Sequence, residues 1–218
     1  MHNGDTGMTR KEREEQERRA LILDVAERLL AEKGLGETSM AEIARESEFG
    51  VGTLYKYFED KNTLIRTLVD DRMRTHFDAL EAALLCEGEP EEKVERTVGA
   101  YLASVKAHNR FFKFFMTSFH PGAAEKGSDP VDVAFLNERR GRIIRLVSSV
   151  FACGIEAGRF APVGAEALGS AIFGMMMSFH FYGECQLGGA WDVEEFKEKI
   201  LTIFFHPVLL VEGRRGES

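Results

Sequence analysis

Apolar residues recur along the chain at the three- and four-residue spacing of amphipathic helices. Valine and isoleucine never alternate with polar residues over a stretch long enough to indicate a strand. The five prolines lie between or at the edges of the helical segments, where a missing amide proton costs least. The pattern predicts an all-α protein with helices over 9–34, 39–47, 51–58, 61–85, 91–108, 110–119, 131–156, 164–186 and 193–205.

Local signals mark both ends of the first predicted helix. Thr9 followed by Glu12 has the spacing of a capping box, in which the two side chains satisfy free backbone amides. Its apolar stripe ends at Gly34, a residue that tolerates the left-handed conformation of a helix C cap. Glu14 with Arg18 has the i,i+4 spacing of an ion pair on one helix face.

The segment from 38 to 58 has the pattern of two short helices joined by a tight turn. Ser39 and Glu42 form a second capping-box pair, and Glu48-Phe49-Gly50 is a three-residue turn whose glycine tolerates a positive φ. The second helix then places its apolar residues on one face: Val51, Leu54 and Phe58. Its other face is small, hydroxylated, basic and phenolic.

Such an outer face fits the major groove of DNA. Gly52 lets the backbone come close, Thr53 can donate to a phosphate or touch a thymine methyl, and the two tyrosine hydroxyls can donate to phosphates. Lys61 adds a cation and free amides at the start of the next helix. The expected DNA contacts are Thr38, Ser39, Gly50, Val51, Gly52, Thr53, Tyr55, Lys56, Tyr57 and Lys61.

Residues 20–65 resemble the tetracycline-repressor (TetR) family across three helices, above all in the run Gly52-Thr53-Leu54-Tyr55-Lys56-Tyr57-Phe58 followed by Lys61. The resemblance implies a three-helix helix-turn-helix domain with an N-terminal arm over 1–60, and a helical-bundle ligand-binding and dimerisation domain over 61–218. Two positions depart from the family. Gly50 stands where a serine is common, and Val51 where a lysine or polar residue is common, so fewer polar contacts are available there.

Basic residues of the first helix are interleaved with glutamates: Arg10, Lys11, Arg13, Arg18 and Arg19. They either contact DNA as a basic arm, as in the family, or form a self-paired and solvated face.

The C-terminal part is rich in phenylalanine and methionine, with polar residues set among them. Any one of these residues alone suits an ordinary helical core, but as a group they predict an adaptable cavity for a largely apolar or aromatic inducer. By resemblance, inducer binding moves the helix 61–85 and changes the spacing of two recognition helices. The expected ligand contacts are Phe111, Phe112, Phe115, Met116, Phe119, His120, Asn137, Phe173, Met176, Met177 and His180.

The segments 164–186 and 193–205 are the expected dimer interface, because in the family two C-terminal helices of each subunit form a four-helix bundle. The residues expected there are Ile172, Ile200, Ile203 and Phe204.

Composition narrows the functional class. A net charge of −8 and a pI near 5.4 exclude a protein that coats nucleic acid through a basic surface. Cys86, Cys153 and Cys185 are an odd number without CxxC spacing, which disfavours a disulfide framework and a thiolate zinc site. The absence of metal-ligand spacings and catalytic motifs predicts no metal, no cofactor and no enzyme activity. The polar N-terminus and the interrupted apolar stretch 168–181 predict a soluble, cytoplasmic protein that does not enter membranes.

The sequence therefore predicts a ligand-responsive regulator, most simply a repressor, that binds a palindromic operator in double-stranded DNA as a homodimer. The alternative is an all-helical small-molecule-binding protein whose helix-turn-helix no longer reads DNA, and Gly50 and Val51 keep it open.

Overall fold

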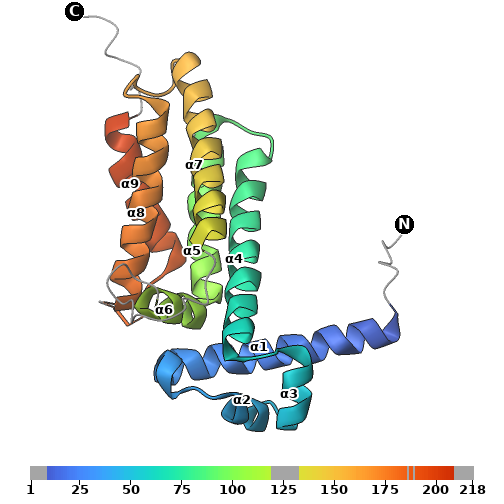
Figure 1. The fold of residues 1–218 in the computed structure, drawn as a ribbon. Helices are drawn as coiled ribbons and strands as arrows, with labels where there is room; N and C mark the ends of the chain where they lie inside the picture. Colours follow the sequence, from blue (N-terminus) through green and yellow to red (C-terminus); the bar gives the residue numbers. More distant parts are fainter. Residues whose placement is uncertain (1–8, 119–132, 186, 189, 209–218) are drawn as a thin grey trace, which may run out of the picture. The chain divides into compact units, whose positions relative to one another are not determined.

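The computed structural model describes residues 9–118, 133–185, 187–188 and 190–208, and the predicted all-α class is confirmed. The described ranges contain α1 (Arg10–Glu37), α2 (Met40–Glu46), α3 (Val51–Tyr57), α4 (Lys61–Leu85), α5 (Pro90–Ala107), α6 (Asn109–Ser118), α7 (Val133–Glu156), α8 (Ala165–Cys185) and α9 (Val193–Val208) (Figure 1). Two compact units result, one from Met1–Asp71 with Arg110–Val131 and one from Arg72–Asn109 with Asp132–Ser218. Helix α4 contributes to both units, and the boundary expected between residues 60 and 61 stays a prediction.

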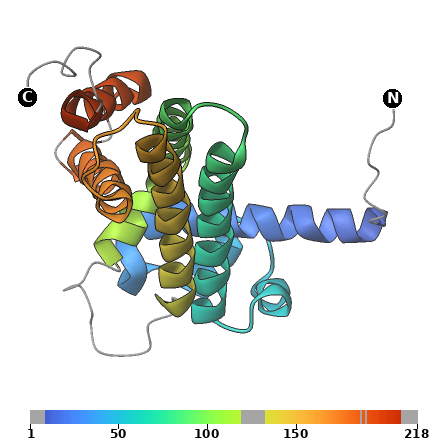
Figure 2. The same ribbon diagram turned by 90° about the horizontal axis from the view of Figure 1, so that it is seen from above.

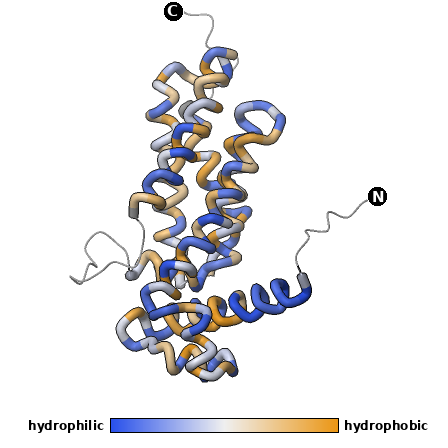
Figure 3. The backbone as a smooth tube through the Cα atoms, turned by 45° about the vertical axis from the view of Figure 1, so that its right-hand side comes forward, coloured by the Kyte–Doolittle hydropathy of each residue, from blue (hydrophilic) through white to orange (hydrophobic). Residues whose placement is uncertain are grey.

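In the first unit, α1 packs on α2 and α2 packs on α3. The capping box at the start of α1 is confirmed, because the Thr9 hydroxyl accepts from the Glu12 amide at 3.3 Å and the Glu12 carboxylate accepts from the Thr9 amide at 2.7 Å. The first turns of α1 are hydrophilic, and burial begins only at Ile22 (Figure 3). The core of these three helices is apolar: Ile22, Leu23, Ala26, Leu29, Leu30, Met40, Ile43, Ala44 and Leu54.

Gly34 interrupts α1 without ending it. Its φ of 80° is positive as expected, but its ψ of 179° is far from the left-handed helical region, and the helix resumes as far as Glu37. This combination of angles is open almost only to glycine. The expected C cap is therefore a kink, which redirects the last turn of α1.

In the second unit, α5 packs against α7, α8 and α9 (Figure 2). Helix α5 begins one residue earlier than the pattern predicted, with Pro90 at its first position and a capping box between Glu89 and Glu92. Helices α7 and α8 form the most extensive contact, and a side chain at Gly169 would collide with Ser148 of α7. This glycine therefore permits the close crossing of the two helices.

Within the described ranges, no helix is long and apolar enough to cross a membrane. The same residues contain no group of three or more His, Cys, Asp or Glu side chains placed to hold a metal ion.

Candidate nucleic-acid interface

Helix α2 is held at both ends by side-chain hydrogen bonds. The Ser39 hydroxyl caps its first turn by accepting from the Glu42 amide at 3.2 Å. The Glu42 carboxylate pairs with Lys33 of α1 instead of returning to Ser39, so only half of the expected capping box forms. At the other end, the buried Ser47 hydroxyl donates to the Ile43 carbonyl at 2.6 Å. These bonds fix α2 as the support for the turn that follows.

The turn between α2 and α3 differs from the expectation at one residue. Glu48 has the positive φ, 60°, whereas Gly50 has an ordinary extended conformation with φ −65° and ψ 143°. The Phe49 amide closes the turn on the Ala44 carbonyl at 2.9 Å. Gly50 is therefore the N cap of α3, and it supplies no side-chain hydrogen bond to the helix. The conformation of the turn does not require glycine at this position. Compared with the serine that is common in the family, Gly50 therefore only removes a side-chain hydrogen bond that would cap α3.

Helix α3 buries one face and exposes the other. Leu54 is fully buried, as expected. Val51 was expected on the same buried face, but it is 42% exposed and lies with the outward residues. Tyr55 is 51% exposed and Lys56 is also exposed, while Thr53 and Tyr57 are half-buried. Because α3 has only seven residues, a single apolar anchor and the adjacent Phe58 suffice to hold it.

Gly52 lies at the centre of this exposed face. A Cβ atom built on Gly52 would have nothing within 4 Å, and its φ is not in the positive range. Nothing within the described chain therefore requires glycine here. Glycine would be required here if another molecule approached the backbone of α3 so closely that a side chain could not fit between them.

Lys61 is committed to the protein itself. Its ammonium donates to the Leu35 carbonyl at 2.7 Å and to the Thr38 carbonyl at 3.0 Å, joining the start of α4 to the end of α1. Thr38 is buried, and its hydroxyl donates to the Gly34 carbonyl at 2.9 Å, so a DNA contact from this side chain requires that bond to open. Both residues position the helix-turn-helix. Their contacts with DNA stay predictions.

Sequence reasoning missed the residue that caps α4. The Asp60 carboxylate accepts from the Thr63 amide at 2.6 Å, and this hydrogen bond lowers the pKa of Asp60. An aspartate three residues before Thr63 is an N-cap signal that the sequence carried.

The basic residues of α1 differ in whether they pair with neighbouring residues of the chain or stay available as a basic arm for DNA. Arg10 pairs with Glu14 at 2.8 Å along the exposed helix face, which is the self-paired arrangement. Arg19 lies over the ring of Phe58 at 5.2 Å, so it ties α1 to the end of α3. No ion pair is recorded within the described residues for Lys11, Arg13 or Arg18, and these three remain the candidates for a basic arm.

The expected inducer residues fall in different surroundings. In α6, Phe111 and Phe112 are buried, whereas Phe115 and Met116 are half-buried and Phe115 stacks on Phe111 at 5.8 Å. Phe119 and His120 lie outside the described residues. Helix α6 is grouped with the first unit and α8 with the second, so a cavity between them stays a prediction.

In the second unit, a polar cluster lies among apolar side chains of α5 and α8. The buried Tyr101 hydroxyl lies 3.1 Å from His180 Nδ1 and donates to the Met177 sulfur at 3.1 Å. Burial lowers the pKa of His180 to about 4, so its imidazole is neutral at neutral pH. Met176 is buried beside this cluster on α8, and Phe173 is half-buried.

Asn137 does not belong to an apolar setting. It is exposed on α7, and its side-chain oxygen accepts from Arg140 at 2.9 Å. The sequence led us to expect Asn137 among apolar residues because many residues of α7 are apolar, but these residues lie on the other face of the helix.

The four expected dimer residues also divide. Ile172, Ile200 and Phe204 are at most 4% exposed, because they pack in the core of their own chain. Ile203 is 54% exposed and is the member of the set with free apolar surface. The periodicity that identified α9 could not distinguish its inner face from its outer face.

Comparison with known proteins agrees with the helix-turn-helix geometry. The model of the family described as "Bacterial regulatory proteins, tetR family" matches residues 22–68. The HTH-type transcriptional regulator HbdR of Aromatoleum sp. is 30% identical over 92 residues, which cover 42% of this chain and 40% of HbdR. YhgD of Bacillus subtilis, also named an HTH-type transcriptional regulator, is 26% identical over 174 residues, 78% of this chain and 86% of YhgD. This chain thus matches less than half the length of HbdR, and 33% of TtgR of Pseudomonas putida.

Solved structures share the fold over most of this chain. The ketosteroid transcriptional regulator KstR2 of Mycobacterium tuberculosis superposes with a TM-score of 0.69 at 18% identity, over 88% of this chain and 95% of KstR2. A TetR-like transcriptional regulator from Rhodococcus sp. RHA1 gives 0.68 at 20% identity, over 87% and 94%. The segment that the family model matches, residues 22–68, runs from the middle of α1 through α2 and α3 into the start of α4, and α2 and α3 have the geometry of a helix-turn-helix. Over residues 22–68 this chain is similar to the TetR family of bacterial regulatory proteins, and its fold is that of TetR-like regulators of known structure.

Proposed function

We propose that this chain is a transcriptional regulator, acting as a repressor, that binds a palindromic operator as a homodimer and is released by a largely apolar small molecule. The outward face of α3 carries the proposal. Gly52 has open space around it, and Val51, Tyr55 and Lys56 are exposed beside it on the same helix. The names of HbdR, TtgR and YhgD, all HTH-type transcriptional regulators, support the same role here.

DNA binding is tested by selecting tight binders from a pool of random DNA duplexes and footprinting the promoter region of the protein's own gene. We expect two half-sites one helical turn apart, or a multiple of it, because a two-fold dimer presents two recognition helices. Binding should weaken steeply as salt rises, since phosphate contacts release counterions. Folded protein that enriches no sequence would contradict the proposal and favour the small-molecule-binding alternative.

Dimerisation is proposed through an exposed stripe of small residues along α8, together with Ile203 of the neighbouring α9. The stripe consists of Ala167, Ser170, Ala171, Gly174 and Ser178. Small side chains let two helices approach closely, and an exposed isoleucine gains by burial in a partner.

A charge at Ile203 should yield monomers, because each substitution acts twice in a two-fold interface. Ile203→Glu is compared by light scattering with Val163→Glu, which changes an equally exposed aliphatic residue outside α8 and α9. A stable dimer for Ile203→Glu rules out this surface.

The inducer is proposed to contact the polar cluster formed by Tyr101, Met177 and His180 in the second unit. A thermal-shift screen of hydrophobic molecules should find ligands that stabilise the fold by mass action. Each hit is then tested for release of the selected DNA, since an inducer must bind the DNA-free form more tightly than the DNA-bound form. Tyr101→Phe, which removes only the hydroxyl, should weaken the response without unfolding the protein.

A further inference from the structure

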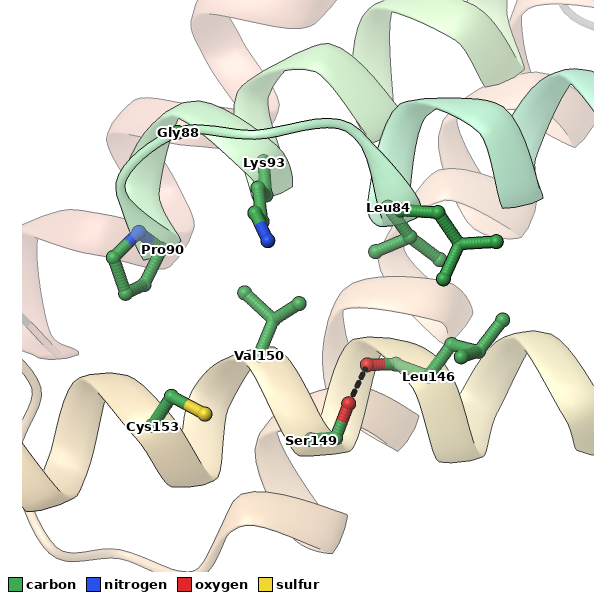
Figure 4. Close-up of a pocket in the computed structure, with 9 residues that line it drawn as sticks. Leu84, Gly88, Pro90, Lys93, Leu146, Ser149, Val150 and Cys153 are labelled. Carbon is green, nitrogen blue, oxygen red and sulfur yellow. Dashed lines mark hydrogen bonds between the residues drawn. The ribbon is translucent and has the colours of Figure 1, made fainter.

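A hollow of about 360 Å³ lies in the second unit, between the last turn of α4, the start of α5 and the C-terminal half of α7 (Figure 4). The volume is within the range of small-molecule sites, roughly 300–1,000 Å³. The walls of the hollow are mainly apolar: Leu84, Leu85, Pro90, Leu146 and Val150. None of these residues belongs to the inducer set expected from the sequence.

Lys93 brings a positive charge to this apolar hollow. Its side chain is half-buried, and Figure 4 shows the ammonium pointing into the hollow towards Val150. Two other polar side chains line the hollow. The Ser149 hydroxyl already donates to the Leu146 carbonyl at 2.7 Å, and the Cys153 thiol is exposed.

The carboxylates closest to Lys93 in the sequence are paired with arginines. Arg159 holds Glu91 at 2.7 Å and Glu89 at 3.0 Å. Arg96 lies 3.7 Å from Glu92. Within the described chain, no ion pair or hydrogen bond is recorded for the Lys93 ammonium. The charge that faces the hollow is therefore not neutralised by these acids.

We propose that the hollow binds a small amphipathic carboxylate. The carboxylate accepts hydrogen bonds from the Lys93 ammonium, and the hydrocarbon body covers Leu84, Leu146 and Val150. An ammonium beside apolar walls favours a ligand with both a negative head and an apolar tail, because either half alone leaves the other part of the site unsatisfied. This proposal concerns binding and does not depend on DNA recognition.

The test uses octanoate as the probe and 1-octanol as a control with the same tail and no charge. Isothermal titration calorimetry of the full chain should detect octanoate, and Lys93→Met should weaken it by roughly tenfold while keeping the apolar stem. The matched control is Lys113→Met on α6, an exposed lysine beside aromatic residues that the sequence predicts for the inducer. Octanoate that does not bind, that binds no better than octanol, or that responds to Lys113→Met instead of Lys93→Met would overturn the proposal.

A second measurement places the ligand. Bound octanoate should slow the alkylation of Cys153 by iodoacetamide, followed by mass spectrometry of the peptide that contains it. Leu85→Glu provides a second variant, because Leu85 is 62% exposed and a carboxylate there repels the ligand without disturbing the core. Equal alkylation of Cys153 with and without octanoate, or full octanoate binding by Leu85→Glu, would show that the ligand lies elsewhere.

Discussion

Replacing Gly52 distinguishes a glycine kept for the fold from one kept for a partner. The position lies in the first turn of α3, its φ is not positive, and no atom lies within 4 Å of an added Cβ. Alanine therefore fits the free protein without strain. If DNA approaches this backbone closely, the same methyl group meets DNA in the complex.

Two effects of opposite sign follow. Alanine is favoured over glycine in a helix by about 0.5–1 kcal/mol, and near a helix end we expect the lower figure. The midpoint of thermal unfolding should therefore rise by roughly 1–3 °C. Forcing an extra group into a close contact typically costs about 1–3 kcal/mol, so operator affinity should fall by roughly 5- to 150-fold, and further for Gly52→Leu.

The assay combines fluorescence anisotropy on the selected operator at fixed salt with thermal unfolding of the same samples. Gly36→Ala is the matched control, because Gly36 also has no neighbour within 4 Å and lies in the last turn of α1. The Gly36→Ala variant should bind the selected operator with the affinity of the wild-type protein. Gly52→Leu with wild-type affinity would refute the reasoning, since the glycine would then have no role in a close approach.

Three further predictions concern the residues that support the helix-turn-helix and the two buried histidines. Lys61→Met should lower the free energy of unfolding by about 2 kcal/mol in urea titration, because it removes two charge-assisted hydrogen bonds to the carbonyls of Leu35 and Thr38. If Lys61 also contacts phosphate, the salt slope of DNA binding falls by about one as well. Gly50→Ser should be about 1 kcal/mol more stable than Gly50→Ala, because the serine hydroxyl can accept from the Thr53 amide; equal stabilities would reject the cap. Burial lowers the pKa of His76 to about 3 and of His180 to about 4, below the value of about 6.5 in the unfolded chain. Stability should therefore be complete above pH 6.5 and fall below it by about 1.4 kcal/mol per pH unit for each histidine, and a double glutamine variant should show a shallower slope between pH 6.5 and 5.

Much of the helical architecture was predictable because its signals are local. The capping box of Thr9 and Glu12 and the range 61–85 of α4 agree with the structure, since caps and apolar periodicity act over a few neighbouring residues. The helix-turn-helix was predictable for the same reason. Its spacing and residue types are set within the short segment that the family model also matches.

Other expectations failed where the answer depended on a neighbouring helix. The pattern placed Val51 inside because it shares a helical face with Leu54, but in the structure Val51 is 42% exposed whereas Leu54 is fully buried. Lys61 appeared to be a free cation because the carbonyls that accept its hydrogen bonds lie more than twenty residues earlier in the chain.

By itself, the sequence determined that this chain is helical, where most of its helices begin and end, and which segment forms the helix-turn-helix. Tertiary structure decided which apolar residues remain available to a partner. Ile200 and Ile203 lie three residues apart on α9, yet one is fully buried and the other is 54% exposed. Tertiary structure also decided that the hollow beside Lys93 lies between the last turn of α4, the start of α5 and the C-terminal half of α7. The physical reason is that periodicity identifies an apolar face, whereas burial and cavities depend on the elements that cross that face in three dimensions.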